Sequence, residues 1–315
     1  MFKGVCFVIN GKNVVSIVVP CYNESEALPY FYDEMTKVLA DMDVLGEMIF
    51  VDDGSKDDTL DILHGLAKRD DRVRFVSFSR NFGKEAAMYA GLKAATGDFI
   101  CIMDADLQDP PALLPQMLDA IINEGYDSVA TKRSTREGEP PIRSFFANCF
   151  YGIINKMSSV KLVPGARDYR LMNRKMCDAV LSLAEYSRFT KGFFEWVGFK
   201  TKWLSYPNVQ RVAGKTKWSF FKLFKYALES IVSLSTAPLT AASVLGGAIS
   251  VLGLVGVIVC ACLGYGIGAW SSAVICVGGM IMLSVGIMGM YVARTYMQVK
   301  NRPIYIVSQT EKDIK

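Results

Sequence analysis

Histidine is almost absent from this sequence, since His64 is the only one among 315 residues. It lies in LDILHGLAKR, whose apolar residues recur with the period of a helix, away from the predicted strand ends described below. Histidine is the side chain most often used for proton transfer near neutral pH, so its scarcity disfavours a histidine-based acid–base mechanism. We therefore predict a structural role for His64.

Charged residues are absent between Glu229 and Arg294. A chargeless run of this length accommodates two membrane spans of about 20 residues or more. We predict spans at 235–263 and 271–293, joined by the turn GYGIGAW. A pair of buried core helices is the alternative, and the length of the run disfavours it. Lysine and arginine lie just outside both ends of the run, so the positive-inside rule predicts a hairpin with both chain ends in the cytoplasm.

Cysteine pairs and glycine-rich phosphate loops are also missing. The eight cysteines contain no C-x-x-C pair, and we interpret them as packing residues of a protein with reduced thiols. Neither G-x-G-x-x-G nor a G-K-[ST] loop occurs. If the ligand is a nucleotide, something other than a glycine-rich helix start must hold its phosphates.

Charge is distributed unevenly along the chain. Residues 1–130 contain 11 Lys and Arg against 22 Asp and Glu, whereas residues 131–229 contain 19 against 7. The basic half leads directly into the predicted spans, where lysine and arginine are attracted to anionic lipid headgroups. A basic patch also suits nucleic acid, but its place beside a membrane hairpin favours lipid or phosphate. We therefore expect no nucleic-acid partner.

The first 130 residues alternate between strand and helix patterns. Strands are predicted at 14–20, 48–55, 73–79, 98–106 and 128–133, and helices at 25–41, 57–68, 84–95 and 110–123. Strands that are apolar throughout and alternate with helices are typical of a mainly parallel sheet covered on both faces. The sequence therefore predicts an α/β fold.

Polar side chains follow four of these strands. In open parallel sheets, ligands bind beyond the carboxyl ends of the strands. We therefore expect one binding crevice, lined by Asn23 and Glu24, by Asp52 and Asp53, by Ser79, Arg80 and Asn81, and by Asp104 and Asp106.

The stretch CIMDADLQDPP, residues 101–111, places three carboxylates within six residues of a strand end. Such a cluster repels itself unless a cation or hydrogen-bond donors lie among its members. Mg²⁺ and Mn²⁺ bind one or two carboxylates together with substrate phosphates, so Asp104 and Asp106, with the neutral oxygen of Gln108, are predicted metal ligands. Asp109 precedes two prolines and is interpreted as a helix N-cap. A capped strand-to-helix turn without metal is the alternative for the whole stretch.

Seven blocks together resemble a known family. They are VVPCYNE, VDDGSKD, SRNFGKE, DADLQDPP, GARDYRLM, RFTKGFFEWVGF and RVAGKTKW, in this order. The sequence resembles the inverting GT-A glycosyltransferases of the dolichol-phosphate mannose synthase type. With its C-terminal hairpin it is most similar to the bacterial bactoprenol (undecaprenyl-phosphate) glucosyltransferases.

The resemblance implies an organisation for the whole chain. A cytoplasmic, Rossmann-like GT-A domain is expected over 1–210, an amphipathic juxtamembrane helix over 211–234, the transmembrane hairpin over 235–293 and a cytoplasmic tail over 294–315. It implies a multi-pass enzyme of the bacterial inner membrane, and a homotetramer is the assembly that it favours.

The resemblance also assigns roles to residues. The catalytic residues would be Asp106, Asp168, Arg211 and Lys217. The donor nucleotide would be bound by Pro20, Tyr22, Glu24, Asp52, Asp53, Lys84 and Asp104. The acceptor phosphate would be bound by Arg133, Arg143, Arg170, Arg211, Thr216 and Lys217, and the Mg²⁺ or Mn²⁺ ion by Asp104, Asp106 and Gln108.

The implied reaction is transfer of one hexose, glucose from UDP-glucose, to undecaprenyl phosphate. The Q-x-x-R-W motif of processive synthases is absent, which favours single transfer. A lipid monophosphate has a second pKa of about 6 and is already anionic at neutral pH, so the acceptor needs no general base. Two roles remain open for Asp168: it would either act as a base or only orient the acceptor. UDP-GlcNAc, GDP-mannose and a modified pentose donor are the alternative substrates.

Two apolar stripes predict contact with the bilayer surface. Residues 143–157 and 217–231 place apolar side chains on one helical face beside basic residues, as interfacial helices do. Core packing against the sheet is the alternative for both. Two other function classes are disfavoured: a transporter, because the spans contain no ionisable residue, and a non-catalytic scaffold, because Asp104, Asp106, Arg211 and Lys217 are all in place.

Overall fold

The structure is a computed structural model that describes residues 13–134, 151–152, 154–158, 160–183, 185–186, 188–207, 232, 235–263 and 267–314. The chain divides into two compact units. The first unit is formed by Met1–Tyr151, Leu162–Trp218 and Pro303–Lys315, and the second by Gly152–Lys161 and Ser219–Arg302.

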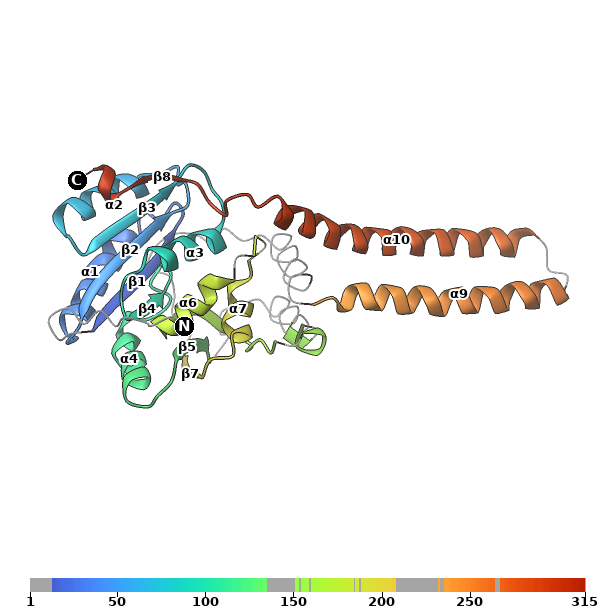
Figure 1. The fold of residues 1–315 in the computed structure, drawn as a ribbon, viewed down its shortest axis with the longest axis horizontal. Coiled ribbons are helices and arrows are strands. Elements are labelled where there is room, and N and C mark those ends of the chain that lie inside the picture. Colours follow the sequence, from blue (N-terminus) through green and yellow to red (C-terminus); the bar gives the residue numbers. More distant parts are fainter. Residues whose placement is uncertain are drawn as a thin grey trace. The chain divides into compact units, whose positions relative to one another are not determined.

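An eight-stranded sheet forms the centre of the first unit within the described residues (Figure 1). Its order is β7-β5-β6-β4-β1-β2-β3-β8. Neighbours among β4, β1, β2 and β3 are parallel, as are β5 and β7, whereas β6 is antiparallel to β4 and β5, and β8 to β3. The strands are β1 (Val14–Cys21), β2 (Leu45–Asp52), β3 (Val73–Phe78), β4 (Phe99–Ile102), β5 (Ser128–Arg133), β6 (Ala166–Asn173), β7 (Thr201–Tyr206) and β8 (Val307–Thr310).

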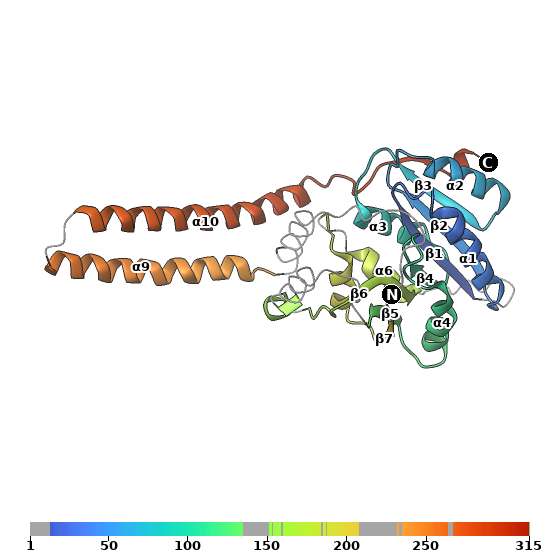
Figure 2. The same ribbon diagram turned by 180° about the vertical axis from the view of Figure 1, so that it is seen from behind.

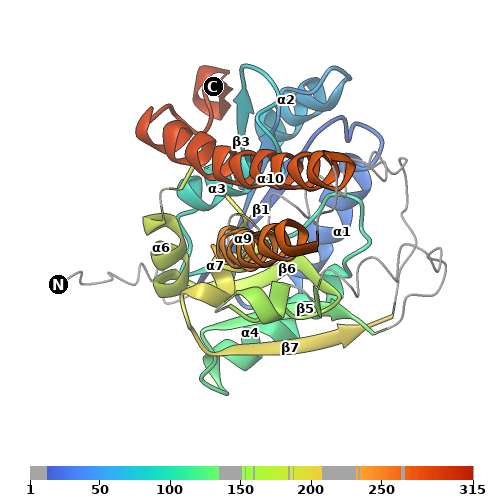
Figure 3. The same ribbon diagram turned by 90° about the vertical axis from the view of Figure 1, so that its right-hand side faces the viewer.

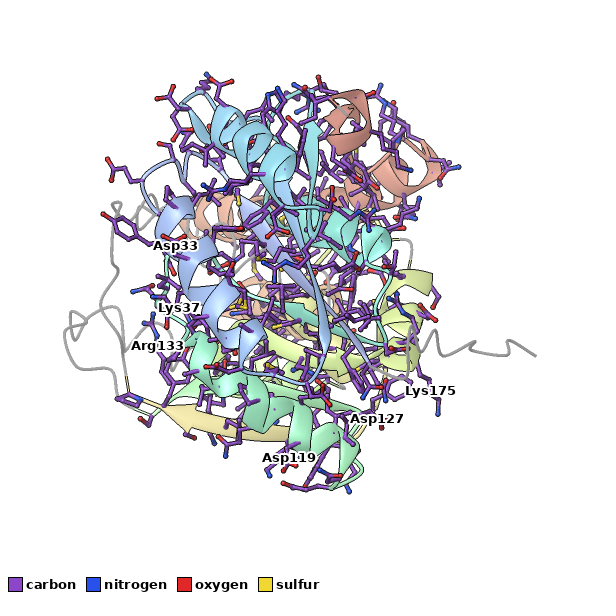
Figure 4. The ribbon with its side chains drawn as sticks, turned by 90° about the vertical axis from the view of Figure 1, so that its left-hand side faces the viewer. Asp33, Lys37, Asp119, Asp127, Arg133 and Lys175 are labelled. Carbon is purple, nitrogen blue, oxygen red and sulfur yellow. The ribbon has the colours of Figure 1, made fainter. Side chains whose placement is uncertain are left out.

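Helices cover both faces of this sheet (Figure 2). On one face lie α1 (Leu28–Ala40), α2 (Thr59–Arg69) and the 3₁₀ turn η1 (Pro111–Leu113) with α4 (Leu114–Ile122). On the other lie α3 (Lys84–Ala94), α6 (Arg174–Ser182) and α7 (Thr190–Trp196). A 3₁₀ turn, η2 (Glu311–Asp313), follows β8. The outer side of α1 is charged, with Asp33 and Lys37 exposed (Figure 4).

Apolar residues on both sides of the central strands explain the two layers. Ile17 of β1 and Phe50 of β2 are fully buried in one cluster, and their neighbours Val18 and Ile49 are fully buried in the other. Helix α3 lies very close to β1, because a Cβ atom at Gly91 would come within 2.2 Å of Val18 Cγ1. A strand buried on both faces has to be apolar throughout, which is the pattern that predicted the sheet.

The predicted elements of the first 134 residues are present. β4 is shorter than its predicted range of 98–106, because the chain leaves the sheet before the carboxylates that follow Met103. The last predicted helix begins as η1 and continues as α4. β6, β7 and β8 had not been predicted. β8 belongs to the predicted tail, 294–315. The end of that tail is therefore part of the sheet of the first unit.

The second unit contains two long helices, α9 (Ala237–Leu263) and α10 (Ile267–Val299). They lie side by side (Figure 3), and the Tyr291 hydroxyl of α10 donates to the Ser235 carbonyl, 2.6 Å away, just before α9. Among the described residues, Val277–Val299 is long and apolar enough to cross a membrane, whereas the apolar stretch Ala237–Gly253 of α9 is shorter. Both helices occupy the predicted spans, and two crossings of a membrane remain a prediction.

Candidate active site

The turns after β1 and β2 are joined by hydrogen bonds. The Asn23 backbone N–H donates to Ser55 Oγ (2.8 Å), and the Lys56 N–H donates to the Asn23 side-chain oxygen (2.8 Å). Asn23 has φ of 52°, a left-handed conformation that asparagine tolerates better than most residues. The Glu24 N–H donates to the hydroxyl of Thr59 at the start of α2 (2.9 Å). These bonds fix the predicted donor-binding turns relative to each other.

Asp52 and Asp53 are both buried at the end of β2, but they accept hydrogen bonds from different parts of the chain. Asp52 accepts hydrogen bonds from the Ser77 hydroxyl (2.8 Å) and the Ser55 N–H (3.0 Å). Asp53 accepts from the backbone N–H groups of Phe82 (2.6 Å) and Gly83 (2.9 Å) and so holds the loop before α3. Burial raises the pKa of Asp53 to about 6, although these N–H groups favour its charged form.

A cavity of about 550 Å³ lies beyond the ends of β2 and β3. Asp52 and Ser77 line it, and Gly54, Ser55 and Lys56 contribute from the turn after β2. Its other lining residues are Tyr22, Leu60, Phe78, Ser79, Arg80, Asn81, Ser308 and Gln309. Of the predicted crevice residues, Asp52, Ser79, Arg80 and Asn81 line the cavity, whereas Asn23, Glu24, Asp53, Asp104 and Asp106 do not. The C-terminal strand, which had not been predicted, contributes Ser308 and Gln309.

Charged side chains meet beyond the end of β4. The Lys84 ammonium, on the first turn of α3, lies 2.6 Å from Asp104 Oδ1 and 2.5 Å from Asp168 Oδ2 of β6. Lys191 of α7 lies 3.5 Å from the other oxygen of Asp168. Asp168 thus joins three separate elements. In the sequence, Lys191 stands within the motif RFTKGFFEWVGF and had no predicted role of its own. Its ion pair with Asp168 depends on the fold and could not be predicted.

The ion pairs set the charge states of this cluster. Burial alone would lower the pKa of Lys84, but Asp104 and Asp168 outweigh it and raise the pKa above the ordinary lysine value. Burial alone would raise the pKa of Asp168, but Lys191 and Lys84 hold it far below the ordinary aspartate value. The cluster therefore keeps Lys84 and Asp168 charged at neutral pH.

Asp106 and Gln108 lie on the loop after β4. Asp106 is only 6% exposed, and its Oδ1 accepts from the Gln108 N–H (3.1 Å). The Gln108 side-chain oxygen lies 3.4 Å from Arg133, at the end of β5 (Figure 4). Two of the predicted metal ligands, Asp106 and Gln108, and one predicted acceptor cation, Arg133, are therefore neighbours.

These residues fit a divalent ion. No group of three His, Cys, Asp or Glu side chains with metal-binding geometry occurs in the part of the chain that the structure describes. Mg²⁺ and Mn²⁺ sites at nucleotides do not need one, because the phosphates supply further oxygens. Asp104 already binds a cation, the Lys84 ammonium, at 2.6 Å. The donor set, two carboxylates and one amide oxygen, is one that such ions accept.

The N-cap interpretation of Asp109 is wrong. Its carboxylate is fully buried and binds Arg167 Nε at 2.8 Å and the Tyr206 hydroxyl, and no side chain caps η1 or α4. A buried aspartate needs such partners more than the turn needs a cap. Asp109 therefore joins the loop after β4 to β6 and β7.

Arg170 is placed deeper than an acceptor-binding residue would be expected to lie. Its guanidinium is buried, binds Glu195 of α7 at 2.8 Å and lies 4.4 Å from the centre of the Phe194 ring. His64 packs against Phe75, with ring centres 5.2 Å apart, in keeping with a structural role. Arg143, Arg211, Thr216 and Lys217 lie outside the described residues, so their predicted roles, like that of Arg170, remain predictions.

Comparisons with known proteins agree on the family. Residues 16–181 match the family model described as glycosyl transferase family 2. An uncharacterized glycosyltransferase of Synechocystis sp. is 39% identical over 301 residues, covering 93% of this chain and 94% of its own. A prophage bactoprenol glucosyl transferase homolog of Escherichia coli K12 is 37% identical, covering 95% and 99%.

A similar fold occurs in a solved structure. The glucosyl-3-phosphoglycerate synthase of Mycobacterium tuberculosis, in complex with Mn²⁺, UDP-glucose and phosphoglyceric acid, matches with 17% identity and a TM-score of 0.49 over 71% of this chain and 79% of that one. A likeness of this size does not bear on the site. The family match spans more than half of the chain and the relatives span nearly all of it, so the chain belongs to glycosyltransferase family 2 and is a glycosyltransferase with a GT-A-like fold.

Proposed function

We propose that this enzyme transfers a single glucose from UDP-glucose to a polyprenyl phosphate at the cytoplasmic face of a membrane, with inversion and with the help of Mg²⁺ or Mn²⁺. The structural observation that carries the proposal is the meeting of Asp104, Asp168 and two lysines beyond β4, in the same row of strand ends as the polar cavity. The relatives named bactoprenol glucosyl transferases, at 37% identity, support the lipid acceptor and the glucosyl donor.

The chemistry assigns separate tasks to the residues. Asp52 and the cavity would hold the nucleoside, and Asp104 with Asp106 and Gln108 would hold the metal. When bound, the ion would neutralise charge on the departing diphosphate. Lys84 and Lys191 would add fixed positive charge beside the reacting phosphates, where it stabilises the transition state without reorganisation.

Asp168 orients rather than abstracts a proton in this scheme. Its pKa is held far below the ordinary aspartate value by Lys191 and Lys84 against the effect of burial, which makes it a weak base. A lipid monophosphate, with a second pKa of about 6, is already anionic and needs no base. Asp168 would instead keep both lysines in place.

The membrane part of the proposal rests on the second unit. α10 contains an apolar stretch of spanning length, and its large apolar side chains are exposed. A lipid acceptor requires the catalytic residues to work near the membrane surface. A hairpin with both ends in the cytoplasm would keep the donor site on the side where nucleotide sugars are made.

Transfer of labelled sugar tests the proposal. Membranes containing the protein are supplied with undecaprenyl phosphate, Mn²⁺ or Mg²⁺ and labelled UDP-glucose, UDP-GlcNAc or GDP-mannose, and label is followed into the organic phase. We expect metal-dependent transfer of glucose, abolished by EDTA and lowered roughly 100-fold or more by Asp106→Asn.

Asp119→Asn is the matched control, because Asp119 is exposed on the outer side of α4 (Figure 4) and should leave transfer unchanged. Transfer from GDP-mannose in place of UDP-glucose would change the donor and keep the reaction. No transfer from any donor would contradict the polyprenyl phosphate acceptor.

A further inference from the structure

The chain returns to the first unit after α10. β8 pairs antiparallel with β3 at the edge of the sheet (Figure 1), with Gln309 opposite Ser77, and the Ser79 N–H donates to the Ile306 carbonyl (3.0 Å). Side chains anchor the segment on both sides of the strand. Tyr305 stacks on Phe78 with ring centres 4.8 Å apart, and Glu311 pairs with Arg74 at 3.2 Å.

Three polar residues form a row across neighbouring strands. Asp52 of β2 is in register with Ser77 of β3, and Ser77 is in register with Gln309 of β8. Residues in register on paired strands present their side chains on the same face of a sheet. The hydrogen bond from Ser77 to Asp52 agrees with this, and all three residues line the cavity.

The amide of Gln309 is oriented by α2. Its side-chain oxygen lies 3.2 Å from His64 Nε2, and the His64 ring is packed on Phe75. The Nε2–H tautomer of His64 donates to this oxygen. In that arrangement the amide NH₂ group makes no other hydrogen bond among the described residues and can donate to a ligand. Asp52, at the other end of the row, can only accept.

An acceptor and a donor in one row suit the edge of a nucleobase. Base edges carry N–H and carbonyl groups side by side, and proteins recognise unpaired bases by hydrogen bonds to these edges. We propose that Gln309, with the adjacent Ser308, forms the part of the donor cavity that recognises the nucleobase, so that the segment after the apolar helices takes part in donor selection. This inference rests on the proposed function, in which the cavity holds the donor nucleotide.

Ligand binding to the full-length protein in detergent tests the inference. Affinities for UDP, GDP and inorganic pyrophosphate are measured by calorimetry with Mn²⁺ present, for the wild type, Gln309→Ala and Lys312→Ala. Lys312 is exposed on η2 in the same tail and does not line the cavity, so it is the matched control. We expect Gln309→Ala to weaken UDP roughly five- to tenfold, as loss of one neutral hydrogen bond does. Pyrophosphate affinity and the thermal midpoint should not change.

Each outcome decides between the two proposals. Equal UDP affinity in the wild type and Gln309→Ala would overturn the inference and leave the proposed function intact. Equal weakening of UDP and pyrophosphate would also overturn it, because Gln309 would then have a structural role alone. If the wild type prefers GDP and Gln309→Ala weakens GDP selectively, the uridine donor fails and the role of Gln309 stands.

Discussion

Lys84 is the residue on which the charge balance beyond β4 depends, because it binds Asp104 and Asp168 at once. Its side chain is partly exposed, but the ammonium itself is held between the two carboxylates. Removing the ammonium would leave two carboxylates without their shared cation, at the place where the proposed function puts the substrate phosphates. Repulsion would then act between the two carboxylates and, in the proposed function, on the donor and acceptor phosphates as well.

We predict that Lys84→Gln lowers transfer roughly 100-fold, because a fixed positive charge beside the reacting phosphates is lost. The measurement is the rate of sugar transfer at saturating donor, with Lys93→Gln as the matched control. Lys93 lies exposed in the last turn of the same helix and pairs with neither carboxylate. Transfer by Lys84→Gln at the wild-type rate would show that Lys84 only stabilises the fold.

At the scale of elements, the predictability of most strands followed their composition. β1, β2 and β3 are apolar and were predicted, whereas β6 reads ARDYRLMN and was assigned only as an acceptor-side motif. Its charges are paired within the fold, Asp168 with two lysines and Arg170 with Glu195, and no local pattern reveals such distant partners. β8 is a four-residue polar edge strand, VSQT, which lacks the apolar pattern of a strand.

The residues of the site also differ in whether the sequence could predict them. Strand-end residues such as Asp52, Asp104 and Asp106 could be proposed from the sequence, because parallel strands bring their carboxyl ends together. Lys191 and Gln309 could not, since their places depend on how α7 and β8 pack. Asp109 was assigned a local role as a cap, whereas tertiary contacts with Arg167 and Tyr206 determine its position.

The loop between β3 and α3 provides a test of pH dependence, because Asp53 holds it through the Phe82 and Gly83 N–H groups. Burial raises the pKa of Asp53 to about 6 in the folded protein, above the unfolded value of about 3.9. The folded state therefore binds the proton more tightly. The stabilisation from this protonation is complete below about pH 4 and is lost as pH rises through about 6.

We predict that Asp53→Asn removes this dependence, since asparagine keeps an acceptor oxygen and carries no charge. Between pH 4 and 7, the free energy of unfolding of the wild type should fall relative to the variant by on the order of 3 kcal/mol, corresponding to about two pKa units. Thermal unfolding in detergent across this range measures it. Parallel pH profiles for the two proteins would contradict the prediction.

At the scale of the whole molecule, chain order and spatial order differ. The family match ends at residue 181, yet the first unit takes in residues up to Trp218 and then Pro303–Lys315 from beyond α10. The chain therefore passes twice into the second unit, at Gly152 and at Ser219, and returns each time to the first unit. The cavity beyond β2 and β3 is therefore completed by Ser308 and Gln309, which follow the apolar helices in the chain.

If α10 crosses a membrane, an arginine should be tolerated near its end but not near its middle. Leu283, 63% exposed, lies near the middle of α10, whereas Val299, 76% exposed, is its last residue. An arginine at the centre of a span costs about 2.5 to 3.5 kcal/mol, but near an end it reaches the interface at little cost. We expect Leu283→Arg to lower the fraction of protein that resists alkaline extraction from membranes, and Val299→Arg to leave it unchanged. Because the two side chains are similarly exposed, a merely soluble surface would tolerate both substitutions equally, and that result would place α10 outside the hydrocarbon core.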